Sequence, residues 1–457
     1  MFTYFMNALK ITGLFAVIIV VVAFLFWPQQ NNREGDRIHV RYWYATGQKE
    51  ELPFTVRLFN DMQDSIFVEA VAIPWQESEK KILSAILSDN PPDIVDHFAP
   101  VVKWASRMGL YPLDDFIAAD QFDSTVIFPA CWQEMKWQGH VFGMPTATAS
   151  YALFYNKELF RQAGLDPEKP PRTWDALRQY ARKLIRRNER GQVTQMGFLF
   201  HLGRTLKVSQ QTEEPLLLMA WQKQVPFTDP QKETVLFANE QMVELLNYVL
   251  EANQDVPLPD QLAFMAGFGY GDQHAFTSGR LAMMILPGNF PDHIAAYRPG
   301  LDYGVSIIPS FEGFPTASST ATWWMAIPRG AKHPRAAWEF IRFVIDKEVQ
   351  LQSLQAMDEN LFPANRLAAM DASFLYKDFN HIFLEQLNYA HSTTIVPLAH
   401  DTFWREFTNA IEWVVYGKQQ PWDALKQAEL IIQNELNRAA AYDRYVREHM
   451  QFPGMRP

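Results

Sequence analysis

The chain from Ile38 onward alternates between short apolar runs and longer segments with helical periodicity. Residues 38–45, 67–74 and 91–98 are rich in β-branched and aromatic side chains, which predicts three strands. Residues 49–62 and 77–89 lie between them and carry apolar side chains at helical spacing. This β-α-β-α-β order predicts a parallel sheet with right-handed crossovers.

Capping residues mark the elements in the middle of the chain. Asn156 can cap a short helix over 156–164 that stops at Gly164, and Thr173 can cap a helix over 174–191. Similar patterns predict a hairpin at 137–145 with Gly139 in its turn and strands at 151–155 and 303–309. Residues 276–286 are predicted to begin as the end of a helix and to continue as a strand. Two further helices are predicted at 333–345 and 421–440, the second with Pro421 at its first position.

Length and charge narrow the class of protein. A chain of 457 residues exceeds what one hydrophobic core usually supports, so we expect two domains. The formal net charge of −10 does not suit a polyanionic partner, which disfavours nucleic-acid binding. The 14 Trp and 34 Phe exceed ordinary core needs and suggest recognition of a flat ligand.

The N-terminus predicts a membrane helix. Residues 11–27 contain no charged side chain and end in Trp27, which suits a membrane interface. No small-residue cleavage pattern follows, and no cysteine there can accept a lipid. We therefore expect a retained signal-anchor over 1–28, a polar linker over 29–37 and an extracytoplasmic globular part. The protein would be a single-pass protein of the cytoplasmic membrane.

Catalytic motifs are absent from the sequence. It contains no P-loop, no G-x-S-x-G and no H-E-x-x-H, so we expect no enzymatic activity and no cofactor or metal. The single cysteine, Cys131, is interpreted as a small buried hydrophobe. Carboxylates could still pair for glycoside hydrolysis, although solvated or capping roles are the default for them: Asp96, Asp114, Asp115 and Asp272.

Aromatic residues stand where the predicted parallel strands end. Trp43 ends the first strand, Trp75 follows the second, and His97 and Phe98 follow the third. Ligands of parallel α/β sheets bind outside the carboxyl ends of the strands. Each ring could instead pack in the hydrophobic core. Because all of them lie at strand ends, however, they favour a binding site for the apolar face of a sugar ring.

Five segments together resemble a known family. Residues 72–95, 151–177, 276–285, 302–309 and 326–344 are similar to the extracellular solute-binding proteins of ABC sugar importers, family 1, of which maltodextrin-binding members are the best known. The motif YNKELFRQAGLDPEKPPRTWDAL is the most specific of them. The resemblance covers about residues 38–440, with the motifs in the same order.

The resemblance implies an α/β fold of two lobes joined by a hinge, with a ligand cleft between them. Lobe one would hold 38–148 and 307–358, lobe two 149–306 and 359–450, and 451–457 would form a tail. It further implies a monomer that binds a mono- or oligosaccharide, closes by hinge motion and delivers it to ABC permease subunits. Two alternatives stay open: a carbohydrate-active enzyme and a sensor-linked sugar-binding module.

The resemblance also implies positions that contact the ligand. The tryptophan of the family's F-W pair, which stacks on sugar, corresponds to Trp404, and another stacking tryptophan corresponds to Phe290. This chain departs from the family in the loop after residues 93–95 and lacks an acidic residue around Thr148, which argues against maltodextrin itself. The full set of candidates is Trp43, Gln48, Trp75, His97, Phe98, Thr148, Phe268, Asn289, Phe290, Trp323 and Trp404.

The stretch STATWWMAIP contains two adjacent tryptophans, Trp323 and Trp324. Neighbouring side chains of a strand point to opposite faces. The family's W-x-x-A-I-P spacing matches Trp323, which implies that Trp323 faces the cleft and that Trp324 packs into lobe one.

Overall fold

The computed structural model describes residues 37–46, 52–202, 213–356, 361–375 and 379–449. The predicted signal-anchor, all of the linker except Arg37, the tail and the candidate Gln48 lie outside these residues. Among the helices of the described residues, none combines the length and the apolar character that crossing a membrane requires.

The larger sheet begins with the predicted parallel unit. β1 (Ile38–Thr46) pairs in parallel with both β2 (Ile66–Pro74) and β3 (Ile94–His97), with α2 (Phe54–Met62) and α3 (Trp75–Leu87) as the connections. This confirms the β-α-β-α-β prediction. Three antiparallel strands complete the order β14-β6-β13-β3-β1-β2: β6 (Met144–Ala149), β13 (Ala321–Ala326) and β14 (Phe362–Pro363).

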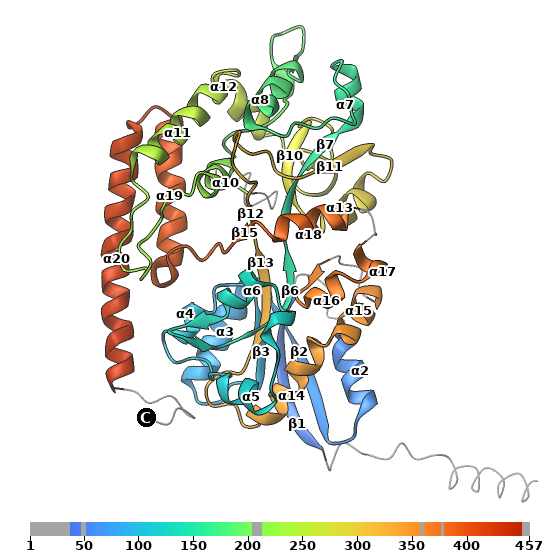
Figure 1. The fold of residues 1–457 in the computed structure, drawn as a ribbon, viewed down its shortest axis with the longest axis vertical. Coiled ribbons are helices and arrows are strands. Elements are labelled where there is room, and N and C mark those ends of the chain that lie inside the picture. Colours follow the sequence, from blue (N-terminus) through green and yellow to red (C-terminus); the bar gives the residue numbers. More distant parts are fainter. Residues whose placement is uncertain (1–36, 47–51, 203–212, 357–360, 376–378, 450–457) are drawn as a thin grey trace, which may run out of the picture.

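A smaller antiparallel sheet lies in the other half of the molecule (Figure 1). Its central strand is β7 (Tyr151–Asn156), which pairs with β10 (Met283–Pro287) and β11 (Tyr303–Ser306). Only Ser150 separates β6 of the larger sheet from β7, and its hydroxyl donates to the carbonyl oxygen of Phe383 at 2.7 Å. The two domains are therefore joined at this residue; the exact lobe boundaries stay a prediction.

The predicted caps are present, but one helix is shorter than expected. Asn156 accepts from the backbone N–H of Leu159 at the start of α7 (Lys157–Gln162), and Thr173 accepts from Ala176 at the start of α8. α8 (Trp174–Lys183) stops eight residues before the predicted end at 191. The segment beyond it forms a hairpin of β8 (Arg186–Arg187) and β9 (Val193–Gln195), because the Asn188 side chain accepts N–H groups of its own turn.

Other predictions can be compared directly. The hairpin at 137–145 is formed by β4 (Lys136–Trp137) and β5 (His140–Val141), with Gly139 at φ 85° in its turn. The helix expected at the start of 276–286 is wrong: residues 275–279 form turns before β10. Further elements are α4 (Val102–Ala105), α5 (Asp114–Ala119), η2 (Ser124–Val126), α6 (Pro129–Glu134), α12 (Leu258–Met265), η3 (Gly271–Gln273), α13 (Phe290–Tyr297), β12 (Ser318–Ser319), α14 (Pro334–Val344), α15 (Lys347–Ala356), α16 (Arg366–Ala369), α17 (Ala372–Leu375), α18 (Asn380–Leu387), β15 (Ala390–His391) and η4 (Pro397–Ala399).

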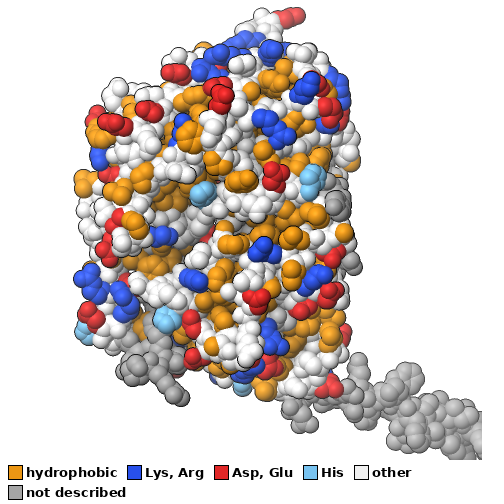
Figure 2. Space-filling view, viewed as in Figure 1, with side chains coloured by type: hydrophobic (Ala, Val, Ile, Leu, Met, Phe, Trp, Pro, Cys, Tyr) orange, Lys and Arg blue, Asp and Glu red, His pale blue; other side chains and the backbone are white. Residues whose placement is uncertain are grey.

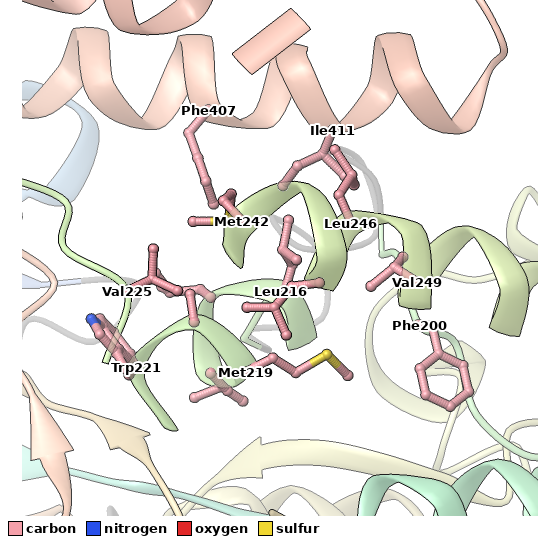
Figure 3. Packing of buried hydrophobic residues seen from close by; sticks show 14 of the residues in the cluster. Phe200, Leu216, Met219, Trp221, Val225, Met242, Leu246, Val249, Phe407 and Ile411 are labelled. Atoms are coloured by element: carbon pink, nitrogen blue, oxygen red, sulfur yellow. The ribbon is translucent and has the colours of Figure 1, made fainter. Parts of the chain in front are cut away.

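Helices α10, α11 and α19 pack with strands β7 and β10 in one core of lobe two. α10 (Pro215–Gln222) is buried along its whole length and lies near α11 (Glu240–Asn253) and α19 (His400–Val415), as Figure 3 shows. Trp221 lies at the edge of this cluster, away from Phe200 (Figure 3). The helical packing fixes α19, which carries the candidate Trp404.

The C-terminal helix α20 (Pro421–His449) runs along one side of the molecule from lobe two to lobe one (Figure 1). It extends nine residues beyond the predicted end at 440, with Pro421 at its first position as expected. Near its end, the buried carboxylate of Asp443 accepts a hydrogen bond from Trp137 Nε1 at 3.2 Å and pairs with Arg447. The helix therefore ties the two halves together.

Candidate functional site

Three aromatic rings form a surface at the carboxyl ends of β2 and β3. The Trp75 ring meets Phe98 edge-on at a centroid distance of 5.1 Å, and Trp323 lies 6.1 Å from Phe98. Phe98 is 50% exposed, whereas Trp75 and Trp323 are half-buried. We call these three residues the aromatic platform. Its position agrees with where ligands bind on parallel sheets.

His97 supports the platform from below. It is buried, and its ring stacks on Phe98 at 5.0 Å. Its Nδ1 accepts from the Ala99 backbone N–H at 2.8 Å, so Nε2 carries the proton and donates to Ser78 Oγ at 3.0 Å. Burial lowers the pKa of His97 to about 4, which keeps the ring neutral. Both nitrogens are occupied, so His97 holds Phe98 in place instead of offering a polar atom to a ligand.

The two adjacent tryptophans differ in exposure. Trp324 is 1% exposed, stands opposite His97 in the β13–β3 pair and meets Trp104 edge-on at 5.4 Å. Its Nε1 donates to the Ala99 carbonyl oxygen at 2.8 Å. Its packing into lobe one is therefore confirmed. Trp323 is half-buried beside Phe98, and its contact with a ligand stays a prediction.

An ion triad links the first turn of α19 to two helices of lobe one. Lys103 Nζ, on α4, lies 3.0 Å from Glu79 Oε1 and 3.1 Å from Asp401 Oδ2. Glu79 follows Trp75 by one turn of α3, and Asp401 precedes Trp404 on α19. This ion triad joins α3, α4 and α19, so it ties the first turn of the helix that carries Trp404 to the helix that begins with Trp75. Figure 2 shows a recess with hydrophobic side chains at mid-height on the viewed face.

Trp404 is fixed by a neighbouring segment of lobe two. The side chain is half-buried and its Nε1 donates to the Thr393 carbonyl oxygen at 3.2 Å. Thr393 belongs to the segment 390–394, which begins with β15. This strand pairs with β12, and the ring of His391 stacks on Trp221 at 4.9 Å with an interplanar angle of 10°. The segment 390–394 is thus held by β12 and by the ring of Trp221.

Glu134 lies where this segment meets lobe one. Its Oε1 accepts from Thr320 Oγ1 at 2.9 Å. Burial raises the pKa of its carboxyl group, while the hydroxyls of Thr322, Ser392 and Thr320 and the backbone N–H of Thr393 favour the ionised form. Sequence reasoning missed Glu134, because the surrounding PACWQEM carries no motif that distinguishes this acid from a surface residue.

The neighbouring Cys131 is buried, as predicted. Burial raises the pKa of its thiol to about 12, which removes thiolate reactivity at neutral pH. Thr148, predicted as a ligand contact, is also fully buried in β6, with its hydroxyl near this thiol. Thr148 stands opposite Thr322 in the β6–β13 pair, and its contact with a ligand stays a prediction.

Asp96, considered for acid catalysis, fastens two strands. Its carboxylate accepts from the Tyr42 hydroxyl and the Ala45 backbone N–H, each at 2.7 Å. Burial is the main cause that raises its pKa to about 7. Because both oxygens serve the β1–β3 junction, the structure supports a structural role for this acid.

Four of the predicted aromatic and polar positions lie elsewhere. Trp43 packs against the core of lobe one. Phe290 is buried in lobe two with its ring 5.6 Å from Phe154, and Phe268 packs on Phe264 at 4.9 Å. Asn289 is half-buried just before α13. The structure does not bring these four residues onto the platform.

The sequence is similar to those of known binding proteins. The family model for bacterial extracellular solute-binding proteins matches residues 58–351. The sn-glycerol-3-phosphate-binding periplasmic protein UgpB of Brucella melitensis is 25% identical over 369 residues, which cover 77% of this chain and 78% of UgpB.

Two solved structures show the same fold. CpMnBP1 with mannotriose bound has a TM-score of 0.70 and 24% identity, and the match covers 87% of this chain and all of that one. The sugar-binding protein MalE from Xanthomonas citri has a TM-score of 0.74 and 20% identity, over 90% of this chain and all of MalE. The two-domain α/β architecture is therefore the solute-binding protein fold.

Proposed function

Since the chain belongs to the bacterial extracellular solute-binding protein family, we propose that it captures a mono- or oligosaccharide between its lobes and delivers it to an ABC permease. The observation that carries this proposal is the aromatic platform of lobe one; the Lys103–Asp401 ion pair, which ties α19 with its Trp404 to this lobe, supports it. Aromatic faces suit the apolar C–H face of a sugar ring, while hydroxyls require nearby polar groups. Capture requires no bond to be broken, so the protein would act as a binder and not as an enzyme.

The names of the similar proteins support two ligand classes. CpMnBP1 is described with mannotriose and MalE as a sugar-binding protein, whereas UgpB is described as binding sn-glycerol 3-phosphate. The platform favours the first class, because a glycerol phosphate offers no ring to stack on three aromatic side chains. Trp75, Phe98, Trp323 and Trp404 are the contacts that we propose for the sugar.

Binding can be tested on the full chain in detergent. Native mass spectrometry of freshly purified protein would reveal a co-purified ligand, and a glycan panel followed by Trp fluorescence would measure affinity. We expect saturable binding of a carbohydrate that is recovered unchanged after long incubation. A glycan panel that shifts neither fluorescence nor melting temperature would contradict the sugar assignment, and conversion of the sugar would indicate an enzyme.

We also propose that residues 1–28 anchor the protein in the cytoplasmic membrane, with the lobes outside. The support is the uncharged run at 11–27 and the lack of a cleavage pattern after it. A short tether would keep the site near its permease and raise its local concentration. Carbonate washing of membranes should leave the protein in the pellet, and its release as a shortened soluble form would disprove the anchor.

A further inference from the structure

His391 presents an exposed imidazole ring whose nitrogens have no hydrogen-bond partner in the described part of the chain. It is the second residue of β15, and its ring stacks on the buried Trp221 at 4.9 Å with an interplanar angle of 10°. Although the residue is exposed, the surrounding protein desolvates the ring and lowers its pKa, which favours the neutral ring at pH 7. A neutral imidazole offers one N–H donor and one acceptor nitrogen. This ring is therefore held by its face and free at its edge.

The side of the chain on which Trp323 lies follows from its neighbours. Thr320, between β12 and β13, donates with its Oγ1 to Glu134 at 2.9 Å, and the hydroxyl of Thr322 also faces this carboxyl group. Side chains alternate along an extended chain, so residues 319, 321 and 323 lie on the side away from Glu134. Trp323 therefore points away from the buried carboxyl group.

The same alternation places His391. The hydroxyl of its neighbour Ser392 faces Glu134, so the side chain of His391 points to the opposite side. The pairing of β12 with β15 agrees, because His391 stands opposite Ser319, which is on the Trp323 side. His391 and Trp323 therefore lie on the same side of the two paired segments.

The two rings are separated by more than one sugar unit. Trp323 follows Ser319, the partner of His391, by four residues, which is about 13 Å in an extended chain. This distance exceeds the length of a single sugar ring. Trp404 lies on the His391 side of this span, because its Nε1 donates to the carbonyl oxygen of Thr393, two residues after His391.

We propose that His391 contacts a sugar unit beyond the one that stacks on the platform, so that the protein selects oligosaccharides over monosaccharides. The inference rests on the proposed sugar-binding function and specifies its ligand class. Sugar hydroxyls both donate and accept hydrogen bonds, and a neutral imidazole can pair with them in either role. A monosaccharide on the platform is too short to reach this ring.

The test uses the full chain in detergent and two ligand series, each titrated by calorimetry: mannose, mannobiose and mannotriose, and glucose, maltose and maltotriose. In a series that binds, the trisaccharide should bind about tenfold or more tightly than the monosaccharide, because it adds contacts to those of the first ring. His391→Phe keeps a ring for Trp221 but removes both nitrogens. It should weaken trisaccharide binding by about threefold to tenfold, the effect of one lost hydrogen bond, and leave monosaccharide binding unchanged.

His449→Phe is the matched control. His449 is also an exposed histidine stacked on an aromatic ring, that of Tyr445 at 4.2 Å, and it lies at the end of α20. Its substitution should change neither affinity. His391→Gln, which again offers a donor and an acceptor, should recover part of the affinity lost in His391→Phe.

Three results would overturn the inference and leave sugar binding in place. They are equal wild-type affinity for monosaccharide and trisaccharide, unchanged trisaccharide affinity in His391→Phe, and a loss in His391→Phe that is the same for every length. A wild type that binds no member of either series would contradict the proposed sugar-binding function itself.

Discussion

Trp323 and Trp324 show how one step along a strand separates two roles. Trp324 is enclosed by His97 and Trp104, while Trp323 lies at the exposed side beside Phe98. His97 belongs to the same stack and remains neutral because burial lowers its pKa to about 4. At this scale a buried ring contributes to stability and an exposed ring is available for binding.

Substitution of the two tryptophans should therefore give opposite results. Trp323→Ala should weaken sugar binding by about 1–3 kcal/mol, the range for stacking on an aromatic ring, with little change in stability. Trp324→Ala should lower the free energy of unfolding by about 3–5 kcal/mol, because it leaves a cavity. Calorimetric titration and urea denaturation measure the two effects. The reverse pattern would show that the faces are assigned wrongly.

His97 should make stability depend on pH. Its folded pKa of about 4 lies below the ordinary histidine value of 6.5, so the unfolded chain binds more protons between these values and stability falls as pH decreases. Between pH 7.5 and 4.5 the loss should be about 2–3 kcal/mol. His97→Asn keeps an acceptor for the Ala99 N–H and removes the titration. As the pH falls from 7.5 to 4.5, the difference in the free energy of unfolding between wild type and variant should shrink. A difference that does not change with pH would contradict the assignment.

At the scale of elements, a bulge in the larger sheet and a close contact between Gly197 and α8 fix how neighbouring elements pack. In the β6–β13 pair, Trp323 is opposite Ala147 and Trp324 is opposite Pro145, so Thr146 is an extra residue on β6. Proline cannot donate to a ladder and is tolerated at such a bulge. In lobe two, Gly197 follows β9 and contacts α8 so closely that an added Cβ would lie 2.2 Å from the Cα of Ala181.

Gly197→Ala should therefore destabilise lobe two. The methyl group would meet backbone, which cannot rotate away, and we expect a loss of about 3 kcal/mol. Gly300→Ala is the matched control, because an added Cβ there has no atom within 4 Å and should change stability by less than about 0.5 kcal/mol. Urea denaturation measures both variants. Equal stability of the two would mean that the α8 contact is looser than described.

At the scale of the whole molecule, contacts on α19 and α20 hold the lobes together beside the site. Lys103 of α4 reaches Asp401 of α19, and Trp137 reaches Asp443 of α20. Both involve residues far apart in the sequence. If the lobes separate by hinge motion when the site is empty, these contacts belong to the closed form and their energy contributes to ligand affinity.

Lys103→Gln should weaken sugar binding and leave lobe stability nearly unchanged. The ion triad is partly exposed, so a loss of about 0.5–1 kcal/mol, roughly a twofold to fivefold change in Kd, is expected. The dependence of Kd on salt should decrease in parallel. Lys81→Gln removes an ion pair within α3 only and serves as the control. An unchanged Kd in Lys103→Gln would show that the pair is not coupled to binding.

Local patterns predicted much of the fold. The parallel β-α-β-α-β unit, the caps at Asn156 and Thr173, and the burial of Trp324 and Cys131 are confirmed. The prediction for α8 placed the end of the helix too late, because the polar residues after it include a turn that is closed by the side chain of Asn188. Periodicity and capping depend on residues a few positions apart, and therefore they can be recognised without tertiary structure.

The sequence by itself determined the order of elements, the parallel start of the larger sheet and the aromatic residues at its strand ends. Only the tertiary structure decided which aromatic rings come together: Trp75, Phe98 and Trp323 form the platform, whereas Trp43 packs against the core of lobe one and Phe290 is buried in lobe two. It also decided that Glu134 meets Thr320, 186 residues away. A hydrophobic pattern specifies the side of an element on which a residue lies, but contacts with distant segments determine what covers that side.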